Sequence, residues 1–190
     1  MDTTRSIEGL EGEARLVIAA TETEDELGTV LRLHLLIEAF LDELLGRQIS
    51  ADLKPFIPTM RSFSDKLGYA YALGLPLSLA AVVRQINGMR NKLAHRDSSG
   101  INPGDAKELA RLTEKLACLV EGEEWLPLNR RFMEIPEKAP GRRFLYGEGN
   151  LRVDFIICFS GFWYIALRYL ALFAANHTTA HKGSAGSRRR

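Results

Sequence analysis

Apolar residues recur along this chain at the three- and four-residue spacing of amphipathic helices, and runs of alternating apolar and polar residues are absent. The strongest apolar stripe consists of Val30, Leu33, Ile37, Phe40, Leu41 and Leu44. Helices are predicted over residues 6–20, 24–47, 61–73, 76–96 and 103–121. The pattern therefore predicts an all-α fold, in which residues 1–121 form an antiparallel bundle of four to five helices.

The predicted helix ends carry residues that favour them. Gly74 and Pro76 separate the third helix from the fourth, because glycine suits a helix C-terminus and proline suits the first turn of the next helix. Asn102 and Pro103 have the form of an N-cap followed by a proline at the first helical position. The fifth helix is therefore expected to begin there.

Residues 122–150 differ in composition from the rest, with prolines, glycines and arginines close together. Because such residues interrupt regular structure, we expect an irregular basic connector here. The last residues, 177–190, are mostly small and basic, and we expect them to form a disordered tail.

The most apolar stretch runs from residue 155 to residue 175 and contains one charged side chain, Arg168. It is long enough to span a bilayer, but a central arginine costs about 2.5–3.5 kcal/mol on membrane-insertion scales. We therefore expect an apolar C-terminal helix over residues 151–176 that packs on the bundle, with Arg168 paired or turned to the surface. A membrane-anchored effector is the alternative.

The composition is that of a soluble globular protein, since 46% of the residues are hydrophobic and 26% are charged. The formal net charge of +1 provides no extended basic track, so any contact with nucleic acid must be local. Cys118 and Cys158 both lie in apolar helical runs, belong to no motif and are expected to be buried, reduced thiols. The first residues contain no apolar signal core, so a cytoplasmic location is expected and membrane association is not.

The segment from Asn87 to Asp97, NGMRNKLAHRD, places a polar band beside a core stripe on one predicted helix. A rotation of about 100° per residue separates three sides of this helix. The core stripe comprises Leu79, Val82, Ile86 and Leu93, the polar band comprises Asn87, Arg90, Asn91, Ala94 and His95, and Gln85, Lys92 and Arg96 face away from both. The band puts an imidazole, a guanidinium and an amide at a half-buried edge where a second chain can pack.

An arginine followed five positions later by a histidine is a weak pattern by itself, because chance matches are frequent. Taken alone, His95 fits a histidine that interacts with the negative end of its helix dipole, which requires no function.

The surrounding residues change that balance. Residues 62–75, SFSDKLGYAYALGL, followed by residues 89–95, MRNKLAH, resemble the HEPN superfamily and, more narrowly, its mannitol operon repressor-like group. The stretch RNKLAH matches the family's motif of an arginine, four to six residues and a histidine, including the polar residue after the arginine. The resemblance covers roughly residues 24–118, and nothing after about residue 121 takes part in it.

The resemblance implies a HEPN-like bundle that dimerises and brings two such motifs into one cleft. Many members are metal-independent endoribonucleases that act as toxins or antiviral effectors, and others are binding or regulatory modules without activity. Carried over to this chain, Arg90 and His95 are the motif pair and Asn91 is the polar neighbour. Some of the toxins carry a tyrosine two residues past the histidine, where a partner enzyme modifies it. This chain has Asp97 there, which puts that mode of control in doubt.

These side chains suit the cleavage of RNA, which carries its own nucleophile in the 2′-hydroxyl group. A histidine that titrates near neutrality can move the proton, and a guanidinium can stabilise the charge that develops on the phosphate. We expect a homodimer that leaves 2′,3′-cyclic phosphate ends, with an antitoxin or regulatory protein as a further partner. No cofactor or metal is expected, since the sequence has no Cys/His ligand cluster. The alternative is a non-catalytic, mannitol repressor-like transcriptional regulator or interaction scaffold.

His34, Glu38 and Asp42 recur every four residues and therefore share one helix face. The functional interpretation is an acidic residue that reaches the Arg90 band and orients it. The competing interpretation is a solvated face with an ion pair worth about 0.3–0.5 kcal/mol. The supporting site candidates are Asn87, Glu38 and Asp97.

Basic residues also cluster at Arg130–Arg131, at Arg142–Arg143 and at positions 188–190. These clusters offer positive charge to RNA phosphate, and the competing interpretation is a solvated surface.

Overall fold

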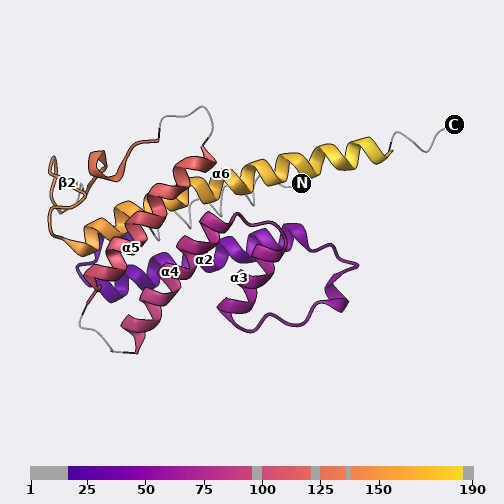
Figure 1. The fold of residues 1–190 in the computed structure, drawn as a ribbon, viewed down its shortest axis with the longest axis horizontal. Coiled ribbons are helices and arrows are strands. Elements are labelled where there is room, and N and C mark those ends of the chain that lie inside the picture. The colour runs from indigo at the N-terminus through magenta and orange to yellow at the C-terminus, as the bar shows by residue number, and fades with distance from the viewer. Residues whose placement is uncertain (1–16, 96–99, 121–124, 136–137, 186–190) are drawn as a thin grey trace.

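The computed structural model describes residues 17–95, 100–120, 125–135 and 138–185, with side chains up to residue 172 in the last helix. Its longer elements are α2 (Glu26–Gln48), α3 (Phe63–Ala72), α4 (Leu77–Ala94), α5 (Pro103–Glu114) and α6 (Leu151–Ala185). Residues 17–22 are also helical, and the rest of the helix predicted over residues 6–20 lies outside the described residues. The described parts of residues 17–120 contain no strand, so the expected all-α character of the bundle is confirmed (Figure 1).

Local capping chemistry fixes where the helices begin and end. The side chain of Asn102 accepts hydrogen bonds from the backbone N–H groups of Gly104 and Asp105, as expected of an N-cap. Gly74 follows α3 with a φ of 109°, a left-handed conformation that glycine adopts without strain. The fifth helix ends earlier than predicted, because the chain tightens into a 3₁₀ helix at Lys115–Leu119.

The core is built around α2, which packs against α3, α4 and α6. The predicted stripe of α2, from Val30 to Leu44, is at most 2% exposed at every position. The predicted stripe of α4, from Leu79 to Leu93, is buried as well. Helical periodicity therefore identified the inward faces of both helices correctly.

The long helix α6 runs along the bundle, and its C-terminal part extends beyond the other helices (Figure 1). Its length and hydropathy between Leu151 and Leu172 would suffice to cross a membrane, but 61% of its most apolar window is buried in the fold. Of its bulky side chains, Tyr164 is 47% exposed, and five others are buried: Phe155, Ile156, Phe159, Phe162 and Trp163. Arg168 donates a hydrogen bond from Nη1 to the Tyr164 hydroxyl at 3.2 Å, in line with the expected pairing.

The helix continues to Ala185, past the predicted end at residue 176. Residues 177–185, which the composition assigned to a disordered tail, are therefore helical, and residues 186–190 lie outside the described residues. No proline occurs in this stretch and its first glycine is Gly183, so nothing local interrupts the backbone hydrogen bonds of the helix before that point.

The predicted irregular connector contains ordered elements. After a 3₁₀ turn at Leu128–Arg130, strands β1 (Phe132–Glu134) and β2 (Arg143–Leu145) pair antiparallel, with Met133 opposite Phe144. Three residues per strand are too few to produce a recognisable alternation, which explains why the sequence did not predict this hairpin. The hairpin packs against α6.

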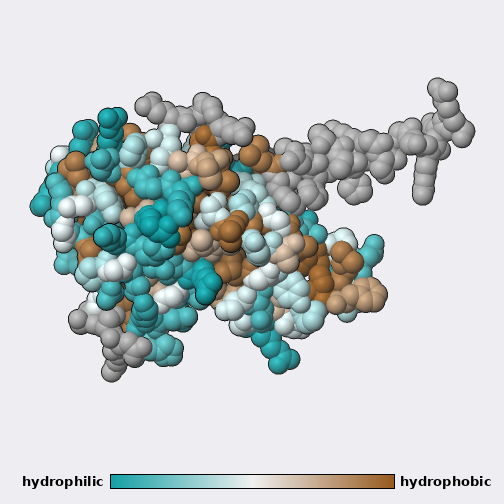
Figure 2. All heavy atoms as spheres, in the orientation of Figure 1, coloured by the Kyte–Doolittle hydropathy of each residue, from teal (hydrophilic) through white to brown (hydrophobic). Residues whose placement is uncertain are grey.

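The connection between α2 and α3 exposes apolar side chains. Phe56 is 82% exposed and Leu53 is 52% exposed, on either side of Lys54. Figure 2 shows hydrophobic atoms gathered on this side of the molecule. An open cleft of about 350 Å³ lies beside them, between the end of α2 and this connection.

Candidate functional site at the end of α4

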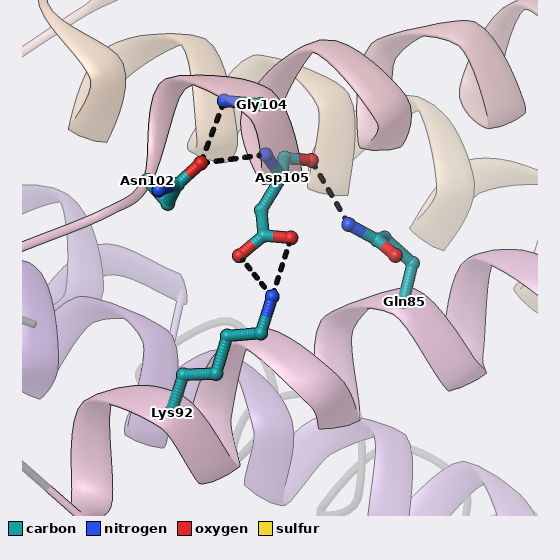
Figure 3. A network of polar contacts seen from close by, with 5 residues as sticks. All are labelled: Gln85, Lys92, Asn102, Gly104 and Asp105. Atoms are coloured by element: carbon teal, nitrogen blue, oxygen red, sulfur yellow. Dashed lines mark hydrogen bonds and ion pairs between the residues drawn. The ribbon is translucent and has the colours of Figure 1, made fainter. Parts of the chain in front are cut away.

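The helix that carries the Arg90–His95 segment is fastened to the start of α5 (Figure 3). Lys92 on α4 contacts both carboxylate oxygens of Asp105 at 2.8 Å. Two helical turns earlier on α4, Gln85 donates a hydrogen bond from Nε2 to the backbone carbonyl of Asp105 at 3.0 Å. The side of α4 opposite the polar band is therefore a structural contact, and it holds the last turns of the helix in a fixed orientation.

Arg90 lies on the part of the polar band nearest the core, and its side chain is half-buried. Its Nη1 atom donates a hydrogen bond to Oδ1 of Asn91 at 3.1 Å. Its Nε atom is buried and has no hydrogen-bond partner in the part of the chain that the structure describes. Because an unpaired buried donor is costly, this guanidinium is suited to gain a partner when an anion or a second chain arrives.

His95 is the C-cap of α4, and its backbone N–H donates to the carbonyl of Asn91 at 3.1 Å. Its position near the helix end is as predicted, but its side chain is exposed and does not lie at the half-buried edge that the sequence predicted, because the helix ends there and no later turn covers it. Five residues separate it from Arg90, which corresponds to a rotation of about 140° around the helix. The two side chains therefore leave the helix in different directions, and Asp97 lies outside the described residues.

A second histidine joins the polar band from α2. His34 is 3% exposed, and its Nε2 atom lies 3.0 Å from Oδ1 of Asn87. Its Nδ1 atom lies 3.4 Å from Oε1 of Glu38, and its ring lies 4.6 Å from the ring of Phe63. Asn87 thus connects the band to α2 through a buried polar contact.

The supporting role predicted for Glu38 takes a different form. Its carboxylate contacts His34, and no ion pair joins it to Arg90 among the described residues. Asp42, one turn further along α2, pairs with Lys66 of α3 at 2.7 Å. Glu38 and Asp42 therefore make separate contacts, and His34 lies between Glu38 and the polar band of α4.

The sequence indicated that His34 is buried, although its spacing with Glu38 and Asp42 suggested a polar face. His34 lies four residues after Val30 and three before Ile37, which is the helical spacing of the buried stripe itself. Its contact with Asn87, by contrast, joins positions 53 residues apart and depends on how α2 and α4 pack.

Burial lowers the pKa of the His34 imidazole. The hydrogen bond with Asn87 and the negative charge of Glu38 act in the opposite direction, and the positive charge of Arg90 lowers the pKa further. His34 is therefore neutral at pH 7, and it responds to the charge of Arg90 although the two residues belong to different helices.

This shift predicts that the free energy of unfolding decreases as the pH falls below the ordinary histidine range. Between the lowered folded pKa and the unfolded value of about 6.5, the unfolded chain binds more protons, so acid favours unfolding. Urea denaturation from pH 7.5 down to pH 5 measures the slope, and His34→Gln should reduce it. His95→Gln is the control for removing an exposed imidazole, and equal slopes in wild type and His34→Gln would contradict the assignment.

No family model matches this chain, and neither does any curated protein or solved structure. The functional conclusion therefore rests on the residues of α2 and α4 and on the chemistry that they can perform.

Proposed function

We propose that this chain is a HEPN-type, metal-independent endoribonuclease that acts as a homodimer, with Arg90 and His95 as the reacting pair. The observation that supports this most is the combination at the end of α4. There, a guanidinium whose buried Nε meets no partner among the described residues precedes an exposed imidazole at the helix terminus. Asn91 stands between them and holds one arm of the guanidinium.

The proposed reaction uses the 2′-hydroxyl of RNA as the nucleophile. One histidine removes the 2′-hydroxyl proton while the 2′ oxygen forms a bond to phosphorus. The bond from phosphorus to the 5′ oxygen breaks, and a second histidine donates a proton to that oxygen. Arg90 stabilises the negative charge that accumulates on the non-bridging phosphate oxygens. The products carry a 2′,3′-cyclic phosphate and a 5′-hydroxyl.

The geometry of α4 favours two copies of the site. A single chain presents one exposed imidazole at this place, whereas the proposed reaction uses two. An isologous dimer through the polar band brings each motif opposite its own copy and supplies both histidines.

The dimer is expected to depend on the small residue inside the polar band. Ala94 is the last residue of α4 and is exposed in the single chain, so Ala94→Arg should leave the fold intact but obstruct the interface. Light scattering at high micromolar concentration should then report a monomer, and RNA cleavage should be lost. Ala72→Arg is the matched control, because Ala72 is the exposed last residue of α3. A wild-type protein that is monomeric in this measurement would refute the proposed dimer.

Cleavage of single-stranded RNA is expected to persist in EDTA, because each proposed step moves a proton or stabilises a charge through protein side chains. End-group analysis should find 2′,3′-cyclic phosphate on the upstream fragment. Loss of activity in EDTA, or fragments with 5′-phosphate ends, would reject this mechanism. If purified wild type cleaves no RNA at all, the regulator or scaffold interpretation replaces the nuclease.

A further inference from the structure

The hairpin beside α6 pairs arginine with aromatic side chains three times in a short span. In each pair the guanidinium carbon lies over the ring, at 4.3 Å from the centroid for Arg131 and Trp125, 4.6 Å for Arg142 and Phe144, and 4.5 Å for Arg143 and Phe132. The Nε atom of Arg143 also donates to Oε1 of Glu134 on the opposite strand at 3.0 Å. A stacked guanidinium keeps its N–H groups in a plane beside the ring, so those that are not already bonded can meet an anion.

An open cleft lies between this hairpin and α6. Its volume is about 260 Å³, and its lining consists of Leu126, Arg131, Phe132, Met133, Ile157 and Ser160. Phe132 is 45% exposed at the cleft, so part of its ring is available to a ligand. The cleft is smaller than the roughly 300–1,000 Å³ of pockets for drug-sized ligands, which suits one planar ring better than a whole small molecule.

Arg131 is built into the wall of this cleft. Its Nε atom donates to the carbonyl of Leu126 at 2.7 Å, which fixes the plane of the guanidinium. Gly161 on α6 leaves the necessary space, because a Cβ atom there would collide with Nη1 of Arg131. The guanidinium is therefore held between the ring of Trp125 and the surface of α6.

We propose that the β1–β2 hairpin and its cleft bind single-stranded RNA, with a base stacked on the exposed ring of Phe132 and phosphates contacted by the arginines. Alternating aromatic rings and basic groups are the features by which single-stranded nucleic acid is held without sequence preference. In a duplex the faces of the bases are covered, so the exposed ring of Phe132 selects unpaired strands. An acidic peptide would use the charges but would gain little from the rings.

This site goes beyond the proposed function, because binding of a strand at the hairpin does not require cleavage at the end of α4. In Figure 1 the hairpin lies at the upper edge of the molecule near the start of α6, and the C-terminal end of α4 lies at the lower edge. The two proposals therefore concern different parts of the molecule.

The test is binding of a short fluorescein-labelled oligouridine to full-length protein that carries His95→Ala, followed by fluorescence anisotropy. Phe132→Ala and the double variant Arg142→Ala/Arg143→Ala should each weaken binding about tenfold, the effect of losing one base–aromatic stack or a pair of phosphate contacts. Arg142→Ala alone is informative if the double variant disturbs the hairpin, because Arg143 bonds to Glu134 on the opposite strand. Far-ultraviolet circular dichroism verifies that each variant is folded.

Two controls match the variants in chemistry and differ in place. Phe56→Ala removes an even more exposed phenylalanine from the connection between α2 and α3. Arg61→Ala/Arg84→Ala removes two exposed positive charges, one just before the N-cap of α3 and one on α4. Both controls should bind oligouridine like the parent protein, and Arg142→Lys/Arg143→Lys should recover only part of the affinity because lysine lacks the planar stacking group.

Several results would overturn the inference. They are hairpin variants that bind like the controls, equal affinity for a matched RNA duplex, or loss of binding with the arginine variants alone together with full competition by polyglutamate.

The two proposals fail separately. Binding that depends on the hairpin without any cleavage by wild type retains this site and rejects the nuclease. Cleavage with an unchanged KM in the hairpin variants retains the nuclease and rejects this site.

Discussion

Replacing His95 by alanine is expected to lower RNA cleavage by at least about a hundredfold and to leave the unfolding transition where it is. The rate effect follows from the loss of general acid–base catalysis, which contributes about 10²–10⁴-fold. The folding effect is small because the imidazole is exposed, and alanine retains the backbone hydrogen bond from residue 95 to the carbonyl of Asn91. Single-turnover cleavage of a labelled RNA and a thermal melt measure the two quantities.

Arg90→Lys is the companion variant, since it keeps the positive charge but removes the planar fork that contacts two phosphate oxygens. It disturbs the half-buried position of Arg90 less than alanine would, so its loss of activity reports on chemistry more than on folding. Arg84→Lys makes the same exchange at an exposed position of α4 and should change nothing. Cleavage at the wild-type rate by both His95→Ala and Arg90→Lys would place the nuclease site elsewhere or identify a contaminant.

Replacing Phe162 by alanine is expected to lower the free energy of unfolding by about 3–5 kcal/mol, the usual cost of emptying a phenylalanine site in a core. The Phe162 side chain is fully buried on α6. Its ring meets Phe40 of α2 edge-on at 6.4 Å between centroids, and it also contacts Phe159 and Trp163. Denaturation by urea, followed by tryptophan fluorescence and circular dichroism, measures the change.

Leu172→Ala is the control on the same helix, because Leu172 is 60% exposed and its truncation should change stability by no more than about 0.5 kcal/mol. A similar small effect for both variants would mean that the aromatic face of α6 is not packed on α2 in solution. That outcome would favour the membrane-anchored alternative for this helix, and alkaline carbonate extraction of cell membranes would then test it directly.

The parts of this fold that the sequence predicted depend on local interactions. The stripes of α2 and α4 follow from a rotation of about 100° per residue, and Asn102 caps α5 with its own side chain. The parts that it did not predict depend on contacts between distant residues. The strands β1 and β2 are three residues each and are stabilised by pairing with each other and by packing on α6.

The candidate site also has features that local sequence predicts and features that depend on contacts between distant residues. The positions of Arg90 and His95 at the end of α4 follow from helix geometry. The predicted half-buried edge holds for Arg90 but not for His95, which is exposed. The contact of His34 with Asn87 requires the packing of α2 on α4, so periodicity could show that His34 is buried but not which residue it meets. The same packing turns Glu38 to His34 and keeps it from the predicted role at Arg90.

The contact between Lys92 and Asp105 joins two residues 13 positions apart in sequence, on either side of residues 96–99. Between these two positions, the backbone N–H of Ile101 donates a second hydrogen bond, to the carboxylate of Glu26 on α2. The ends of this connection are therefore fixed by residues outside residues 96–99. Since doubling the length of a flexible loop costs only about 0.6 kcal/mol in closure entropy, insertions between Arg96 and Ser99 should leave the imidazole of His95 where it is. This short connection is thus a place where new binding specificity can be built next to the site without disturbing the helix that carries it.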